Sequence, residues 1–135
     1  MSKAAINNFP ESLEKINLNR CQNISAFNIH HLVSLKEIDC GRSSITDAAI
    51  NNFPQSLEII NLNYCNNIST FNINHLVNLK EIYCGGSSIT GVAINNFPES
   101  LEIINLNGCA NISAFNINHL VNLKEIYCGG SSITD

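Results

Sequence analysis

The amino-acid sequence repeats at a fixed interval along almost its whole length. The string AINNFP occurs three times, opening at Ala5, Ala49 and Ala93, so each copy begins 44 residues after the previous one. A leucine recurs at half that interval, at Leu13, Leu35, Leu57, Leu79, Leu101 and Leu123. A short fixed period is typical of solenoids, in which each repeat forms one coil stacked on its neighbours. The sequence therefore predicts a single domain over residues 1–135, with six 22-residue coils in three units, 4–47, 48–91 and 92–135.

Each coil contains a short stretch in which apolar and polar residues alternate. In the first coil Ile16 and Leu18 flank Asn17, and the same pattern returns in every later coil. A period of two is typical of a β-strand with one buried face. We therefore expect the strands of successive coils to pair in parallel, with the apolar residues pointing inward. Pro10 and its two counterparts limit the segment around AINNFP to short helical or 3₁₀ turns.

The residues around the recurring leucines also follow a consensus. Odd coils read LEKINLNRCQNI, LEIINLNYCNNI and LEIINLNGCANI, which fit LxxLxLxxCxxL. Even coils read LKEIDCGRSSI or LKEIYCGGSSI, which fit LxxLxLxxNxL with Cys at the third apolar place and Ser at the asparagine place. This pattern resembles the leucine-rich-repeat family and covers essentially the whole chain. A thiol or hydroxyl in place of the family's asparagine can still donate to loop carbonyls.

The resemblance implies a particular architecture. A leucine-rich-repeat solenoid belongs to the α/β class and is a right-handed β-α superhelix shaped like a horseshoe. Short parallel strands line its concave face, and short helical or 3₁₀ segments line its convex face. The resemblance also implies a concave surface that recognises a protein partner.

Charge and hydropathy exclude two classes of partner. Seven Lys and Arg residues are outnumbered by eleven Asp and Glu residues and are scattered along the chain. Nucleic-acid binding needs a clustered basic surplus, so we do not expect a nucleic-acid ligand. We also find no apolar run of signal-peptide type and none long enough to cross a bilayer, which predicts a cytoplasmic protein without a membrane partner.

The six cysteines fall into two columns rather than into a disulfide framework. The columns are Cys21, Cys65 and Cys109, and Cys40, Cys84 and Cys128. Members of one column lie two coils apart, about 9.6 Å at the spacing of parallel strands. A disulfide needs Cα atoms within about 7 Å. We therefore expect six free thiols in the core, as in a reducing compartment, and a buried thiol is a poor nucleophile.

The remaining chemical motifs favour structural roles. His31 and its two counterparts are also two coils apart, which is too far for them to share a metal ion at a bond length of about 2.0 Å. The GGSSIT string at Gly85 lacks the lysine of a phosphate-binding loop. Glu37 and its counterparts are equally separated, so no acid–base pair forms. The sequence predicts no enzyme activity, no cofactor and no metal site.

The candidate binding surface consists of the polar columns that the strands are expected to present outward. The first two units differ at ten positions, none in the apolar ladder, and four of these, 15, 20, 39 and 42, fall on this surface. Drift of exposed positions is favoured over selection for binding as the explanation, because exposed return-segment positions vary too. The three tyrosines are the best anchors, because tyrosine is enriched at interface hot spots. The candidate residues are Lys15, Asn17, Arg20, Asp39, Arg42, Asn61, Tyr64, Tyr83, Asn105 and Tyr127.

Two functions remain as hypotheses. The first is a non-catalytic scaffold for protein–protein interaction through the concave sheet. The alternative is a structural or engineered self-associating repeat module with no natural ligand. Near-identical units, the lack of a polar capping repeat and a phase in which Asp135 would lead into another Ala4 favour this alternative. It predicts a homo-oligomer formed by end-to-end stacking.

Overall fold

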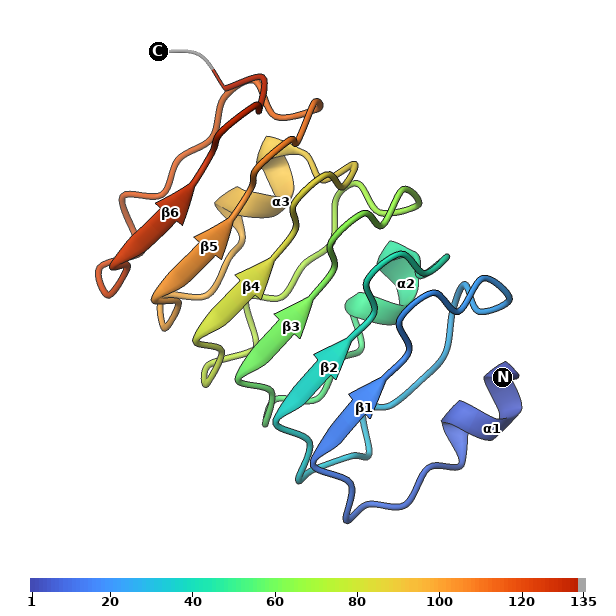
Figure 1. Cartoon of the computed structure of the whole chain (residues 1–135). Helices are drawn as coiled ribbons and strands as arrows, with labels where there is room; N and C mark the ends of the chain where they lie inside the picture. Colours follow the sequence, from blue (N-terminus) through green and yellow to red (C-terminus); the bar gives the residue numbers. More distant parts are fainter. Residues whose placement is uncertain (134–135) are drawn as a thin grey trace.

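Each coil contributes one three-residue strand to a single parallel sheet in the computed structural model, which describes residues 1–133. The six strands follow one another in chain order, β1 to β6, as Figure 1 shows. Their bounds are β1 Lys15–Asn17, β2 Glu37–Asp39, β3 Ile59–Asn61, β4 Glu81–Tyr83, β5 Ile103–Asn105 and β6 Glu125–Tyr127. The predicted parallel-strand solenoid is confirmed.

The register of the sheet has the period of the sequence. Ile16 lies opposite Ile38, and Ile38 lies opposite Ile60, so each residue pairs with the residue 22 positions later. A shift by one residue would turn every buried isoleucine toward solvent. Burial of the central isoleucine therefore holds each strand in this register.

The core lies between the sheet and the return segments that connect one strand to the next. The central isoleucines of β2 to β5 are at most 1% exposed. Phe53, Phe71 and Phe97 close the core on the return side, where the rings of Phe71 and Phe97 stack with centroids 6.4 Å apart. Every interior coil thus buries its apolar residues against the coils on both sides.

Three short helices lie in alternate return segments of the described residues. They are α1 Lys3–Asn7, α2 Asp47–Ile50 and α3 Gly91–Asn95. Figure 1 shows all three on one side of the sheet. Each precedes the proline of the AINNFP string, as the sequence predicts, and the remaining described return segments consist of turns and bends. No helix in this part of the chain has the length and apolar character needed to cross a membrane.

The two kinds of return segment contact each other through specific polar groups. In the first unit the side-chain oxygen of Asn7 accepts the backbone N–H of Asn28 at 2.8 Å. The Nε2 atom of His31 lies 2.9 Å from the carbonyl oxygen of Phe9. Both contacts recur in the second and third units. The histidine column therefore joins one return segment to the next, which gives these side chains a structural role.

Candidate binding surfaces

The outward face of the sheet carries seven of the ten candidate residues. Each occupies the first or third position of a strand, so its side chain points away from the core, and each is exposed or half-buried. We call this surface the strand face. Its candidate residues are Lys15, Asn17, Asp39, Asn61, Tyr83, Asn105 and Tyr127.

The other three candidates, Arg20, Arg42 and Tyr64, do not lie on the strand face. They occupy the turn that follows each strand, with backbone φ angles of 65°, 57° and 58°. The corresponding positions of the later coils are glycines with φ between 65° and 71°. The turn requires a left-handed residue, and these three residues adopt that conformation beyond the end of each strand. The structure therefore places these three candidates beyond the strands, in the turn at the end of each.

Arg42 and Tyr64 instead form a separate group, which we call the turn cluster. The guanidinium carbon of Arg42 lies 4.5 Å from the centroid of the Tyr64 ring, within range of a cation–π interaction. Gln22 donates a hydrogen bond from its side-chain amide to the carbonyl oxygen of Arg42. With Asn66 and Asn67, these residues line an open recess of about 450 Å³.

Gln22 and Asn66 line this recess but were not predicted from the sequence. A signal was present, because Arg20, Arg42 and Tyr64 occupy the repeat position that is glycine in the last three coils. Glycine at one fixed place in several coils indicates a left-handed turn. That interpretation would have placed the residues beyond the end of each strand.

Carboxylates on the strand face hold its tyrosines in place. The Tyr83 hydroxyl donates to Glu81, and the Tyr127 hydroxyl lies 3.3 Å from a carboxylate oxygen of Glu125. The hydrogen bond to Glu81 and partial burial raise the pKa of Tyr83 to about 12. The hydroxyl therefore stays protonated at neutral pH, and its hydrogen bond restrains the ring on the sheet surface.

The N-terminal half of the strand face is hollowed beside Tyr83. The hollow has a volume of about 150 Å³ and is lined by residues of β1 to β4. Lys15 and Glu37 form an ion pair of 3.4 Å at one side, and the apolar side chain of Ile59 contributes to the lining. This part of the surface offers both charge and apolar area to a partner.

A row of alternating charges precedes the strands. Successive coils carry Glu14, Lys36, Glu58, Lys80, Glu102 and Lys124 at this position. Neighbouring members form ion pairs, Lys36 with Glu58 at 3.6 Å and Lys80 with Glu102 at 3.5 Å. Lys124 also reaches Glu102, at 3.4 Å, and lowers the pKa of that carboxyl. We call this row the charge ladder.

The cysteines are free, as expected, but they are not equally buried. Cys40, Cys65, Cys84 and Cys109 lie in the core, whereas Cys21 and Cys128 in the end coils are half-exposed. The expectation of six core thiols was therefore wrong for these two. The Sγ atom of Cys65 donates to the carbonyl oxygen of Cys40 at 3.0 Å, and the same bond recurs in the next unit. A thiol in place of the family's asparagine thus donates to a backbone carbonyl, as expected.

Thiol reactivity should separate the two classes of cysteine. Burial raises the pKa of the Cys40 and Cys84 thiols, so their reactive thiolate forms are scarce as well as inaccessible. In the folded chain we expect iodoacetamide to modify Cys21 and Cys128 at least about tenfold faster than the four core thiols. Mass spectrometry of timed digests measures the rates. Equal rates in the native chain, with the unfolded chain as the reference, would contradict the placement of the cysteines.

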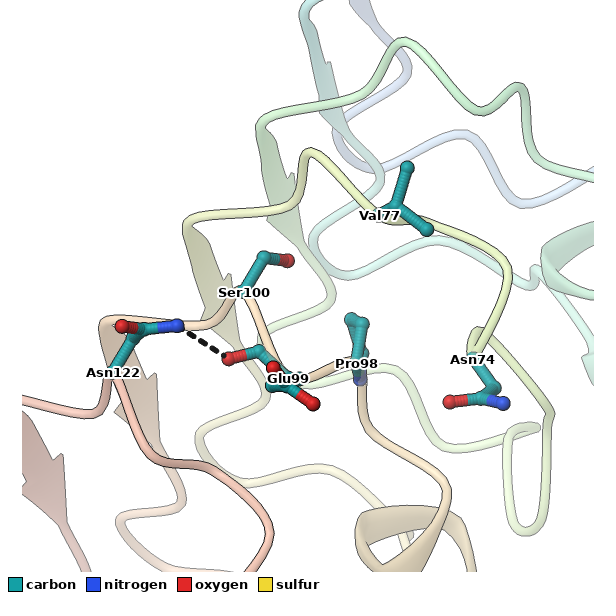
Figure 2. Close-up of a pocket in the computed structure, with 6 residues that line it drawn as sticks. All are labelled: Asn74, Val77, Pro98, Glu99, Ser100 and Asn122. Carbon is teal, nitrogen blue, oxygen red and sulfur yellow. Dashed lines mark hydrogen bonds between the residues drawn. The ribbon is translucent and has the colours of Figure 1, made fainter.

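Another recess lies on the return side and is shown in Figure 2. It has a volume of about 410 Å³ and is lined by Asn74, Val77, Pro98, Glu99, Ser100 and Asn122. The Asn122 side chain donates to the carbonyl oxygen of Glu99 at 3.2 Å. A similar recess occurs one unit earlier, around Pro54 and Gln55. The recess is thus a product of coil stacking, and no charged side chain is buried in it.

Within residues 1–133, no group of three or more His, Cys, Asp or Glu side chains is arranged to hold a metal ion. No protein-family model and no curated protein matches the chain. The functional proposal therefore rests on the geometry of the repeat.

Proposed function

We propose that the chain is a leucine-rich-repeat solenoid that acts as a non-catalytic scaffold and binds a protein partner on a concave strand face. The observation that carries the proposal is the composition of that face. It presents Tyr83 and Tyr127 on neighbouring even coils, each held by a carboxylate two residues earlier. A restrained aromatic side chain loses little entropy on binding and offers a large contact area with a polar tip.

The charges of the strand face indicate the chemistry of the partner. Lys15 is paired with Glu37, whereas Asp39, Glu81 and Glu125 add negative charge along the same surface. A partner with lysine or arginine side chains beside an apolar group complements this surface. We therefore propose a basic, extended polypeptide segment as the binding partner.

A peptide library tests this proposal without a known partner. Random peptides displayed on phage are selected on the immobilised chain, and the binding of synthetic copies is measured by fluorescence polarisation. We expect the selected peptides to be basic. Changing Tyr83 and Tyr127 together to alanine should weaken their binding about tenfold or more, because two anchoring rings are lost.

A matched variant on the return side provides the control. Val33 and Val121 are 69% and 72% exposed, so Val33→Ala with Val121→Ala removes a similar number of exposed apolar side chains from the opposite surface. This variant should bind the peptides as the wild-type chain does. Peptides that respond to the valine changes and not to the tyrosine changes would remove the strand face from consideration.

A further inference from the structure

The two end coils expose apolar surface that every interior coil buries. All three residues of β6 are exposed, and Ile126 is 38% exposed where its counterpart Ile104 is completely buried. At the opposite end, a recess of about 310 Å³ is lined mainly by apolar residues. The lining residues of this N-terminal recess are Met1, Phe9, Pro10, Leu13, Lys15, Ile16, Asn17 and Leu18. Each end thus carries half of a coil-to-coil interface.

The backbone groups at the two ends are complementary donors and acceptors. Inside the chain, Cys40 N–H donates to the Asn61 carbonyl at 2.8 Å, and Glu58 N–H donates to the Lys36 carbonyl at 2.8 Å. In the last coil, the equivalent groups are the Cys128 N–H and the Lys124 carbonyl. The described residues contain no later coil with which these two groups could form hydrogen bonds. In the first coil the matching groups are the Asn17 carbonyl and the Glu14 N–H.

The charges of the two ends are complementary as well. The charge ladder begins with Glu14 and ends with Lys124. At the next position along the strand, β1 begins with Lys15 and β6 begins with Glu125. Placing β6 of one chain beside β1 of another in the internal register pairs Lys124 with Glu14 and Glu125 with Lys15. Two opposite-charge pairs would then form at the contact between the copies.

Side chains on the return side complete the match. The Phe71 and Phe97 rings stack between a turn-type return segment and the helical return segment that follows it. Continuing this contact by one unit brings Phe115 of one copy against Phe9 of the next, and both rings are only half-buried in the single chain. In the same way, Ser100 Oγ donates to the Leu79 carbonyl at 2.6 Å, and Ser12 is the equivalent donor for the Leu123 carbonyl of the preceding copy.

We infer that copies of this chain bind one another head to tail, with β6 of one copy beside β1 of the next and Ile126 opposite Ile16. The occupant of each end face is a second copy, because the contact continues the coil-to-coil interface already present between β2 and β3. Such a contact uses different surfaces on the two partners and adds copies in one direction. The end faces share Lys15, Asn17 and Tyr127 with the strand face. The inference does not depend on the proposed strand-face partner, because it rests on the buried contacts and backbone groups of the end coils.

Two charge reversals test the register. Glu14→Lys places two adjacent lysines on the N-terminal end, and Lys124→Glu places two adjacent glutamates on the C-terminal end. Sedimentation velocity of the wild-type chain over a concentration series should show an average mass that rises with concentration. Each variant alone should associate about tenfold more weakly, because a like-charge pair replaces an opposite one.

The equimolar mixture of the two variants is the decisive sample. The lysine introduced at position 14 of one variant meets the glutamate introduced at position 124 of the other, while the second junction keeps the original pairing. Association should therefore return to the wild-type level or exceed it. Glu11→Lys changes the net charge by the same amount as Glu14→Lys on an exposed residue outside the charge ladder, and it should associate like the wild-type chain. Circular dichroism checks that every variant is folded. A wild-type chain that stays monomeric, or a mixture no better than its components, would overturn the inference.

Cysteine protection tests the direction of stacking. Head-to-tail contact covers Cys128 of one copy and Cys21 of the next, so the alkylation rates of both should fall as the concentration of the wild-type chain rises. A two-fold contact through β6 would protect Cys128 alone and would stop at a dimer. Protection of a single cysteine therefore rejects the head-to-tail arrangement even if the chain associates.

Discussion

Replacing Phe53 with alanine is expected to lower the free energy of unfolding by about 3–5 kcal/mol. The ring is completely buried between the sheet and the neighbouring return segments. Its removal loses the transfer free energy of the side chain and leaves a cavity that the coils on either side keep open. The free energy of unfolding of a whole domain is about 5–15 kcal/mol, so this single change should remove a large part of it.

Phe9 provides a matched control for this change. It occupies the same place in the first unit, but no coil precedes it among the described residues and its ring is only half-buried. Phe9→Ala should therefore cost no more than about 2 kcal/mol. Urea titrations followed by circular dichroism compare the two variants, with Glu14→Lys in every sample so that self-association does not add stability. Equal losses for the two alanine variants would contradict the coil-by-coil packing.

Replacing Cys84 with proline should also destabilise the fold, by about 2–4 kcal/mol. The Cys84 N–H donates to the Asn105 carbonyl at 2.9 Å across the boundary between two coils. Proline removes that donor and leaves the carbonyl between the two coils without its partner. The preceding residue, Tyr83, is already in a strand, so the extended conformation that proline favours before itself is available.

Two variants separate the hydrogen bond from other effects of this substitution. Cys84→Ser keeps the N–H and measures the effect of changing the buried side chain. Cys128→Pro makes the same backbone change one unit later, where no described coil accepts the bond. In the Glu14→Lys background, we expect Cys128→Pro to cost at least about 1 kcal/mol less than Cys84→Pro. If both prolines have the same effect in urea titrations, the inter-coil hydrogen bond is not the cause of the loss.

The sequence predicts the sheet well because one physical requirement is repeated in every coil. The isoleucine in the middle of each alternating stretch has to be buried, and the 22-residue interval leaves one parallel register that buries them all. The same interval predicted that the cysteines of a column lie too far apart to form disulfides. The interval also predicted that the histidines lie too far apart to share a metal ion. Their contact with a return-segment carbonyl became visible only in the structure.

The candidate surfaces were harder to predict, because they depend on single backbone angles and on position along the solenoid. Arg20 and Arg42 follow the strand in the sequence, and a left-handed φ places them in the turn beyond it. Cys21 and Cys128 carry the same local sequence signal as their buried counterparts, and their partial exposure comes from their place in the end coils. Likewise, the pairing of Tyr83 with Glu81 depends on the side-chain conformation chosen within an ordinary strand.

The alternation of two return segments sets the step by which such a protein can change its length. The side-chain oxygen of Asn7 and the carbonyl of Phe9 both face groups on the return segment that follows, Asn28 and His31. Gain or loss of a single 22-residue coil by recombination would bring two return segments of one kind together and leave these groups mismatched. A 44-residue insertion or deletion preserves every junction, so whole units are the increments in which the gene can grow or shrink without redesign of the core.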